Sequence, residues 1–377
     1  MKNSHFSVPA RWAGLSCVVL GATLASTANA QTSSVSIGGI VDAAVRHDWG
    51  SDQGGQTGLV SGQMAASRIT FAGEEQLGGQ LKAGFVLESG LSLDSGTGHA
   101  NPPGVSGTGI SFGRTSALSL GTNEHGFLSV GRQYTPLWSV TGTPANDPFS
   151  ATWLGGTGTL FNTTIRVSNS IVFSHGYGSR AMIRPAPVSG LGFALMYGLP
   201  EASGGAPSRS GQQMGFNLSY GAPQWWVGYG FHQVRGSNEA MSTTALITDM
   251  PKLQQQVLGA SVLTGRTRWH VSINTGKTDN NSVNTRAWYA GINHPLNDRH
   301  VLRVSYGRSD DRTSVNADFR ALQLGYQYLL SRRSSLYATY GFINNSDSGK
   351  RTFSNAMGTY SAGATAQTLA LGMRHNF

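Results

Sequence analysis

The sequence predicts an all-β fold, a transmembrane antiparallel β-barrel. Three observations predict it: long segments alternate apolar and polar residues, short and long polar connections follow one another, and no helical period lasts long enough to build a helical domain. A count of the alternating segments gives about sixteen strands, within the range of membrane barrels. Only 12% of residues are charged and 51 are glycine, and no apolar run approaches the length of a membrane-spanning helix.

The N-terminus has the pattern of a secretory signal peptide over residues 1–30. Lys2 and Arg11 precede an apolar run at 13–25, and Ala28-Asn29-Ala30 fits a cleavage site. A membrane helix is the alternative, but the run is too short to cross a bilayer. Residues 31–377 are therefore expected to form one barrel domain. The single cysteine, Cys17, lies in the signal segment, so no disulfide is expected in the exported chain.

The charge distribution argues against nucleic acid as a partner. The net charge is +9, but lysine and arginine are scattered and the longest basic run is Arg332-Arg333. Gly276-Lys277-Thr278 lacks the first glycine of a phosphate loop, and the Cys and His residues do not have metal-ligand spacing. The sequence therefore predicts no cofactor, no metal site and no enzyme.

Alternation is clearest in the second half of the chain. In residues 319–330, Leu322, Leu324 and Tyr326 share one face, while glutamines and small residues share the other. The same pattern occurs in residues 35–46, 268–276, 302–308 and 369–377. A soluble sandwich also alternates, so alternation alone leaves the choice open.

The connections favour a membrane barrel, because such barrels have short turns on one rim and longer loops on the other. Short connections are expected at 74–79, 121–126, 221–223, 264–267, 293–298 and 330–334. Longer ones are expected at 47–62, 92–108, 133–166, 200–210, 236–251, 278–282, 309–316 and 346–362. Aromatic residues near strand ends, which would form an interfacial girdle, add support: Trp225, Trp226, Trp269, Trp288, Tyr289, Tyr326, Tyr328, Tyr337, Tyr340 and Phe377.

Several segments resemble the general bacterial porins, and most closely those of Burkholderia- and Bordetella-like bacteria. They include SVGRQYTPLW at 129–138, NDPF at 146–149 and LALGMRHNF at 369–377, together with residues 33–47, 67–90 and 332–345. The segments keep their order over nearly the whole exported chain. His375 departs from the pattern, since an apolar residue is expected there.

The resemblance implies an outer-membrane barrel of sixteen strands that forms homotrimers. It also implies that the third long loop, about 133–166, folds into the lumen and narrows it. Phe377 resembles the signal that the barrel-assembly machinery reads. The other implied partners are outer-membrane lipid, lipopolysaccharide, small hydrophilic solutes and anions.

Four residues are predicted to form the pore constriction. Arg68 opposes the apolar Ile69 and Phe71, so parity alone places it toward the lumen. Resemblance adds Arg114 and Arg166 to an inward arginine cluster, and makes Asp147 their acidic partner in the loop. Three arginines against one acid predict a modest anion preference, since salt screens distant charges. The alternative is that the arginines pair with Asp147 and Glu74 for structural reasons.

Further side chains are possible pore-lining residues, although they could lie near the rims: Asp42, Arg46, Glu74, Lys82, Arg303 and Arg374. Arg320 shares parity with Leu322 and Leu324 and is expected to snorkel on the outer face. The predicted function is a passive, water-filled diffusion channel for small hydrophilic solutes and ions. The alternatives are a substrate-specific outer-membrane channel, a barrel adhesin or a barrel enzyme.

Overall fold

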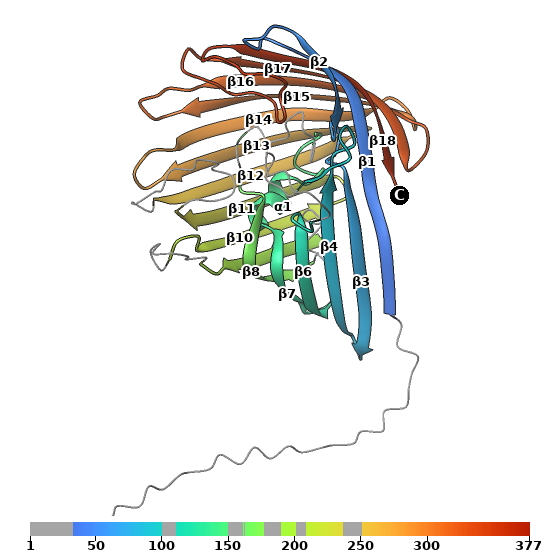
Figure 1. Cartoon of the computed structure of the whole chain (residues 1–377). Coiled ribbons are helices and arrows are strands. Elements are labelled where there is room, and N and C mark those ends of the chain that lie inside the picture. Colours follow the sequence, from blue (N-terminus) through green and yellow to red (C-terminus); the bar gives the residue numbers. More distant parts are fainter. Residues whose placement is uncertain are drawn as a thin grey trace, which may run out of the picture. The chain divides into compact units, whose positions relative to one another are not determined.

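A computed structural model describes residues 33–99, 111–149, 161, 163–176, 190–200, 209–236 and 251–377 of the chain. Nearly all regular structure in these residues is antiparallel sheet (Figure 1). No helix in them is long and apolar enough to cross a bilayer. The predicted signal peptide lies outside the described residues.

Sixteen strands form a closed antiparallel ring in which each pairs with its neighbours, as the sequence predicted. They are β1 (Ser33–Trp49), β3 (Arg68–Gly78), β4 (Leu81–Leu91), β6 (Thr115–Thr122), β7 (Gly126–Tyr134), β8 (Arg166–His175), β9 (Gly190–Gly198), β10 (Gln213–Ala222), β11 (Trp225–Arg235), β12 (Lys252–Thr264), β13 (Thr267–Thr278), β14 (Asn284–Pro295), β15 (His300–Asp311), β16 (Phe319–Leu329), β17 (Ser334–Asn345) and β18 (Thr365–Asn376). Two short segments, β2 (Gln56–Ser61) and β5 (Gly98–His99), pair with β1 and β4.

The ring closes where β1 meets β18. Ten residue pairs join these strands, from Ile40 opposite Asn376 to Trp49 opposite Gln367. Gly39 and Phe377 exchange both of their backbone hydrogen bonds at 3.1 Å. From the neighbouring β17, the hydroxyl of Tyr337 donates to Oδ1 of Asp42 at 2.6 Å. The seam is therefore held by backbone and side-chain contacts together.

The polarity of the wall is reversed relative to a soluble protein. In β16, Gln323 and Gln327 are buried while Leu324 and Tyr326 are exposed. The same alternation of buried polar and exposed apolar side chains recurs around the ring, as lipid outside and a polar interior require. Successive strand residues point to opposite faces, so adjacent aromatics cannot all join an outer girdle. Trp225 and Trp288 are indeed exposed, whereas their neighbours Trp226 and Tyr289 are buried.

Tyr337 was also predicted to belong to the outer aromatic girdle, and this prediction is wrong because its side chain is buried. The rest of the exposed belt includes Trp269 on β13 and Tyr326 on β16.

The two rims differ in their connections. Hairpins join β10 to β11, β12 to β13 and β16 to β17 within a few residues, while the other rim carries long connections such as 92–114, 135–165 and 346–364. The connection 176–189, on the short-turn rim, is longer than its neighbours, and most of it lies outside the described residues.

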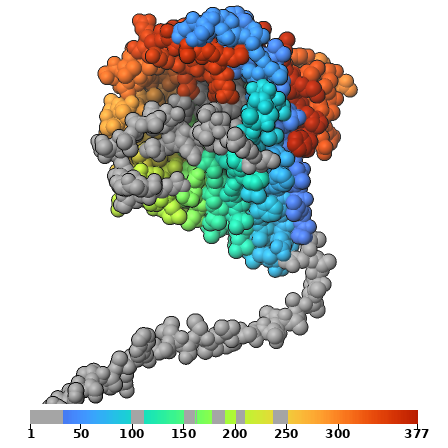
Figure 2. All heavy atoms as spheres, in the orientation of Figure 1, coloured from blue at the N-terminus to red at the C-terminus, as the bar shows by residue number. Residues whose placement is uncertain are grey.

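On the long-loop rim, the first connection binds the last. Gln53 and Asp52 accept hydrogen bonds from the backbone N–H groups of Thr359 and Ser361, at 2.9 and 3.0 Å. Figure 2 shows the first connection, in blue, against the red C-terminal segments.

Candidate constriction site

The segment after β7 begins with a short helix that the sequence reading did not predict, α1 (Pro136–Thr141). Thr135 caps it, since its Oγ1 accepts a hydrogen bond from the backbone N–H of Trp138 at 3.0 Å. Pro136 occupies the first helical position, where a missing N–H costs nothing. The TPLW sequence at 135–138 therefore carries a local helix-start signal.

This segment contacts the inward side chains of distant strands. The side-chain amide of Asn217, on β10, donates to the carbonyl of Pro136 at 2.9 Å. His270, on β13, lies 3.2 Å from the carbonyl oxygen of Ala145. Tyr289, on β14, donates its hydroxyl hydrogen to Oδ1 of Asp147 at 2.5 Å. The described part of the segment thus lies along β10 to β14.

Glycines on the facing wall allow this close approach. A Cβ atom at Gly230, on β11, would lie 3.1 Å from the backbone Cα of Leu137. At Gly259, on β12, it would overlap the side-chain oxygen of Asn146. Any larger residue at these two positions would push the segment away from the wall.

Apolar side chains anchor the segment at two points. Leu137 and Val140, from α1, are fully buried against wall residues that include Trp226 and Val257. Phe149 is fully buried in a second cluster with Phe319, Ala321, Ile343, Phe353 and Ala366. The described part of the segment is therefore packed against the wall at these two points.

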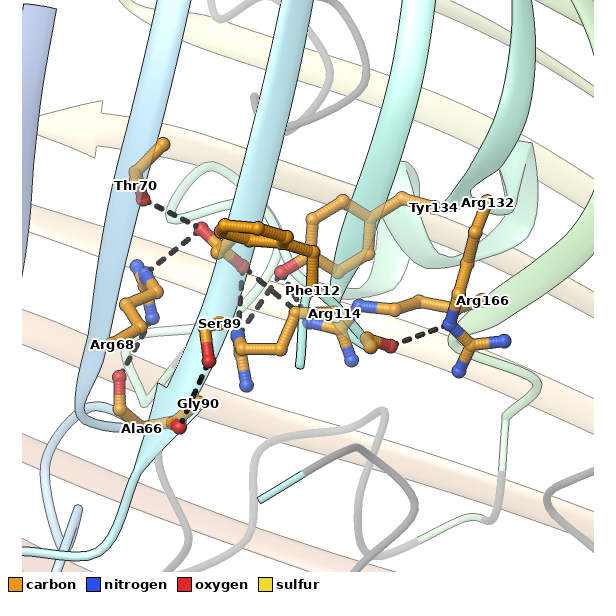
Figure 3. Close-up of polar contacts among 12 residues, drawn as sticks. Ala66, Arg68, Thr70, Ser89, Gly90, Phe112, Arg114, Arg132, Tyr134 and Arg166 are labelled. Carbon is orange, nitrogen blue, oxygen red and sulfur yellow. Dashed lines mark hydrogen bonds and ion pairs between the residues drawn. The ribbon is translucent and has the colours of Figure 1, made fainter. Parts of the chain in front are cut away.

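Across from these anchors, three arginines converge on Glu88 of β4. Nε of Arg114 lies 2.7 Å from Oε1 of Glu88, and Nε of Arg68 lies 3.2 Å from Oε2. Arg166 is more distant, with Nη2 4.0 Å from Oε1. The register explains the meeting, because Glu88 stands opposite Thr70 of β3 and Thr115 of β6. Figure 3 shows the arginines reaching toward one another from neighbouring strands.

Tyr134, at the end of β7, ties two of the arginines together. Its hydroxyl accepts a hydrogen bond from Nη2 of Arg114 at 3.2 Å and another from Nη2 of Arg166. The guanidinium of Arg166 also lies over the tyrosine ring, 4.2 Å from its centroid. Arg132 adds a fourth guanidinium beside this group (Figure 3), where it donates to Ser168 at 2.7 Å.

The cluster formed by Arg68, Glu88, Arg114, Tyr134 and Arg166 is called here the arginine cluster. Three guanidinium groups and one carboxylate give it a formal charge of +3 − 1 = +2. Arg68 is the most exposed of the three, with 22% of its side chain accessible against 5% for Arg114 and 3% for Arg166. Arg68 therefore presents its charge to water most directly.

The structure thus brings together Arg68, Arg114 and Arg166, but the carboxylate among them is Glu88, which the sequence reading missed. Glu88 has the same strand parity as Lys82, so alternation along β4 could have marked it as inward. Arg114 could not be placed by parity because it precedes the first residue of β6.

The predicted acidic partners bind elsewhere. Asp147 accepts hydrogen bonds from Tyr289 and from the backbone N–H of Phe149. Glu74 pairs with Lys82 at 3.0 Å. The alternative interpretation, in which the arginines form ion pairs with carboxylates, therefore predicted the right kind of contact. The carboxylate in these pairs is Glu88, however, and not Asp147 or Glu74.

The remaining predicted residues are distributed along the inner wall and the rims. Arg46 is buried in a two-bond ion pair with Asp48 and also donates to Ser354 of the last long loop. Asp42 accepts hydrogen bonds from the backbone of the 62–67 segment. Arg303 on β15 and Arg374 on β18 are half-buried. Phe377 is 46% exposed beside Gly39.

Comparisons with known proteins decide what this barrel is. A model of the Gram-negative porin family matches residues 16–348. The chain belongs to the Gram-negative porin family. It is therefore a passive channel of the outer membrane. No group of three or more His, Cys, Asp or Glu in its described residues could hold a metal ion.

Individual relatives of this porin agree with the family. The outer membrane porin protein 32 of Delftia acidovorans is 28% identical over 384 residues, which cover 96% of this chain and 99% of the relative. The structure of an anion-selective porin from Comamonas acidovorans aligns with a TM-score of 0.75 at 24% identity, over 92% of this chain and 100% of that one.

A trimer form of OmpT, an outer membrane protein of Vibrio cholerae, aligns with a TM-score of 0.64 at 16% identity, over 92% of this chain and 100% of that one. At these identities the two solved structures show the fold alone.

Proposed function

We propose that this porin conducts small hydrophilic solutes and ions with a modest preference for anions, and that the arginine cluster sets this preference. The observation that carries the proposal is the formal charge of +2 around Arg68, Glu88, Arg114 and Arg166 on the inner wall. A positive field in a narrow aqueous passage raises the local concentration of anions and lowers that of cations.

The segment 133–166 narrows the lumen in this proposal. Support comes from its buried anchors, Leu137, Val140 and Phe149, and from its hydrogen bonds to β10, β13 and β14. A barrel of sixteen strands is wide enough for an open aqueous channel. A segment packed across part of that width would set an upper limit on solute size, while the arginine cluster acts on charge.

Transport needs no energy source and no chemical step. Solutes move down their gradients, and selection comes from width and charge. Arg303 on β15 and Arg374 on β18 extend the positive wall beyond the cluster. Glu88 moderates the field by neutralising one of the three arginine charges.

The finer features of the assembly belong to the same proposal. Export by a signal peptide at residues 1–30 follows from the N-terminal pattern of basic, apolar and small residues. Trimerisation, contact with lipopolysaccharide and recognition of Phe377 by the barrel-assembly machinery follow from the resemblance. The trimer form of the Vibrio cholerae relative supports the trimer. We propose no enzymatic activity.

The test is the reversal potential of the purified porin in a planar bilayer under a salt gradient. We expect an anion-signed potential that shrinks in Arg68→Ala, with Arg114→Ala and Arg166→Ala giving changes of the same sign. Arg332→Ala is the matched control, because it removes an equally charged but exposed side chain from the short-turn rim. A cation-signed potential in the wild type, or an equal change in Arg332→Ala, would refute the role of the cluster.

A further inference from the structure

Two aromatic side chains lie beside the arginine cluster. Tyr134 is the last residue of β7, and Trp138 is the third residue of α1. Their rings are nearly parallel, with an angle of 15° between the planes and 6.4 Å between the centroids. Both residues are half-buried, so part of each ring is accessible. This pair of rings is called here the aromatic face.

The fold fixes the position of the Trp138 indole. The backbone N–H of Trp138 donates to Oγ1 of Thr135 at 3.0 Å, and its carbonyl accepts from the backbone N–H of Gly142 at 2.7 Å. The indole lies over Gly142, where a Cβ atom would come within 2.9 Å of the ring. A larger residue at position 142 would therefore displace the indole.

The indole lies on the side of α1 that does not pack on the wall. Leu137 and Val140 are fully buried in a cluster with wall residues, whereas Trp138 remains accessible. The accessible part of the indole therefore faces away from the wall. Among the residues that the structure describes, the indole N–H has no hydrogen-bond partner. It is a donor that a ligand could use.

Positive charge lies close to the aromatic face. The hydroxyl of Tyr134 accepts from Nη2 of Arg114 at 3.2 Å, and Arg114 binds Glu88 at 2.7 Å. Arg68 binds the other oxygen of Glu88 at 3.2 Å. The guanidinium of Arg166 lies over the Tyr134 ring, 4.2 Å from its centroid (Figure 3). Three successive polar contacts thus join the aromatic face to Arg68, which is within the span of one small organic molecule.

Arg68 has donors left for a further anion. Its Nε pairs with Glu88, and its Nη1 donates to the carbonyl of Ala66 at 2.9 Å. In the described part of the chain its Nη2 has no partner. A guanidinium carries five N–H donors, and 22% of this side chain is accessible. A carboxylate can therefore bind Arg68 without displacing Glu88.

We propose that the inner wall binds aromatic carboxylates, with the carboxylate on Arg68 and the ring against the aromatic face of Tyr134 and Trp138. Aromatic rings contact one another more favourably than the buried area alone accounts for, because their quadrupoles are complementary in stacked and edge-to-face arrangements. A small aliphatic anion would use Arg68 alone and would be held less tightly. This inference rests on the proposed function, since it requires an anion-conducting lumen that the segment 133–166 narrows.

The test compares two anions of equal charge and similar size, benzoate and cyclohexanecarboxylate. Each is added to the purified porin in a planar bilayer, and the concentration that halves the chloride current is measured. We expect benzoate to act at about a fivefold lower concentration, because an aromatic contact is worth roughly that factor beyond its buried area. Equal concentrations for the two anions, or a current that neither anion lowers, would overturn the proposal. This comparison needs no variant.

Variants assign the effect to the aromatic face. Trp138→Leu should bring the two concentrations together, whereas Trp138→Phe, which restores a ring, should keep them apart. Trp288→Leu is the matched control, because it removes an exposed tryptophan from the lipid-facing side of β14. Undiminished preference for benzoate in Trp138→Leu, or an equal loss in Trp288→Leu, would contradict the assignment.

The reversal potential in a sodium chloride gradient separates this inference from the proposed function. An anion-signed potential without any preference for benzoate would remove the aromatic site and leave the anion preference in place. A cation-signed potential would remove the anion preference, and the aromatic carboxylate site with it.

Discussion

Replacing Glu88 by glutamine tests whether the arginine cluster acts through its net charge. Glu88→Gln keeps the size of the side chain and an oxygen that can still accept from Arg114 or Arg68. The formal charge of the cluster rises from +2 to +3, since three guanidinium groups remain and the carboxylate is lost. Anion preference should therefore increase.

The size of the effect follows from Coulomb's law. A unit charge about 5 Å from a passing monovalent ion is worth ~0.8 kcal/mol in water, and ~0.1 M salt screens this to roughly 0.5 kcal/mol. The change favours the anion and disfavours the cation by the same amount. Their permeability ratio should thus shift toward anions by about fivefold. Losing a buried ion-pair partner should also lower the free energy of unfolding, by about 3–5 kcal/mol.

The assay is the reversal potential in a planar bilayer under a salt gradient, measured on folded channels. Glu75→Gln is the matched control. Glu75 lies on the outer face of β3, so this substitution makes the same chemical change away from the lumen. A potential that stays at the wild-type value in Glu88→Gln, or moves toward cations, would refute the electrostatic reasoning.

Two further predictions concern the loops. Phe149→Ala should raise single-channel conductance if, as proposed, the segment 133–166 narrows the lumen, because Phe149 fills a fully buried site that anchors this segment. The same change should lower the free energy of unfolding by about 3–5 kcal/mol. The milder Phe149→Leu is the control, and a conductance that is unchanged in both variants would contradict the anchoring. Hydrogen bonds from Ser361 and Thr359 hold the pKa of Asp52 below its usual value, so its contribution is present at neutral pH and lost only as pH falls through that lowered pKa. We expect Asp52→Ala to make the last long loop sensitive to proteolysis at neutral pH, whereas the wild type should become sensitive only in strong acid. Asp298→Ala is the control, and equal protease sensitivity in this variant would argue that Asp52 does not hold the last loop.

The part of the fold that could be predicted is the part in which inward-facing and outward-facing residues alternate regularly along a single strand. Alternation at 319–330 and 268–276 gave strands close to β16 and β13, because lipid and water impose opposite demands on successive residues. The same reasoning placed Arg68 inward. Parity failed where the chain is not a strand, as at Arg114, and where a capped turn such as α1 interrupts the loop.

The contacts of the site could not be read in the same way. Glu88 and the three arginines come from separate strands or strand ends, and their meeting depends on the register of β3, β4 and β6. Tyr134 joins the cluster through the bulge between Gly131 and Gln133, which changes the facing of the last residues of β7. Register and bulges are set by neighbouring strands, so a one-dimensional pattern does not contain them.

The seam between β1 and β18 has a consequence for biogenesis. Its residue pairs join positions separated by most of the chain, from Ile40 with Asn376 to Trp49 with Gln367. Until β18 is delivered, every partly assembled sheet has two open edges, which bilayer lipid cannot hydrogen-bond and which other chains could extend. A chain truncated before β18 would therefore be unable to close the barrel. We expect such a chain to be bound by a holdase chaperone or degraded.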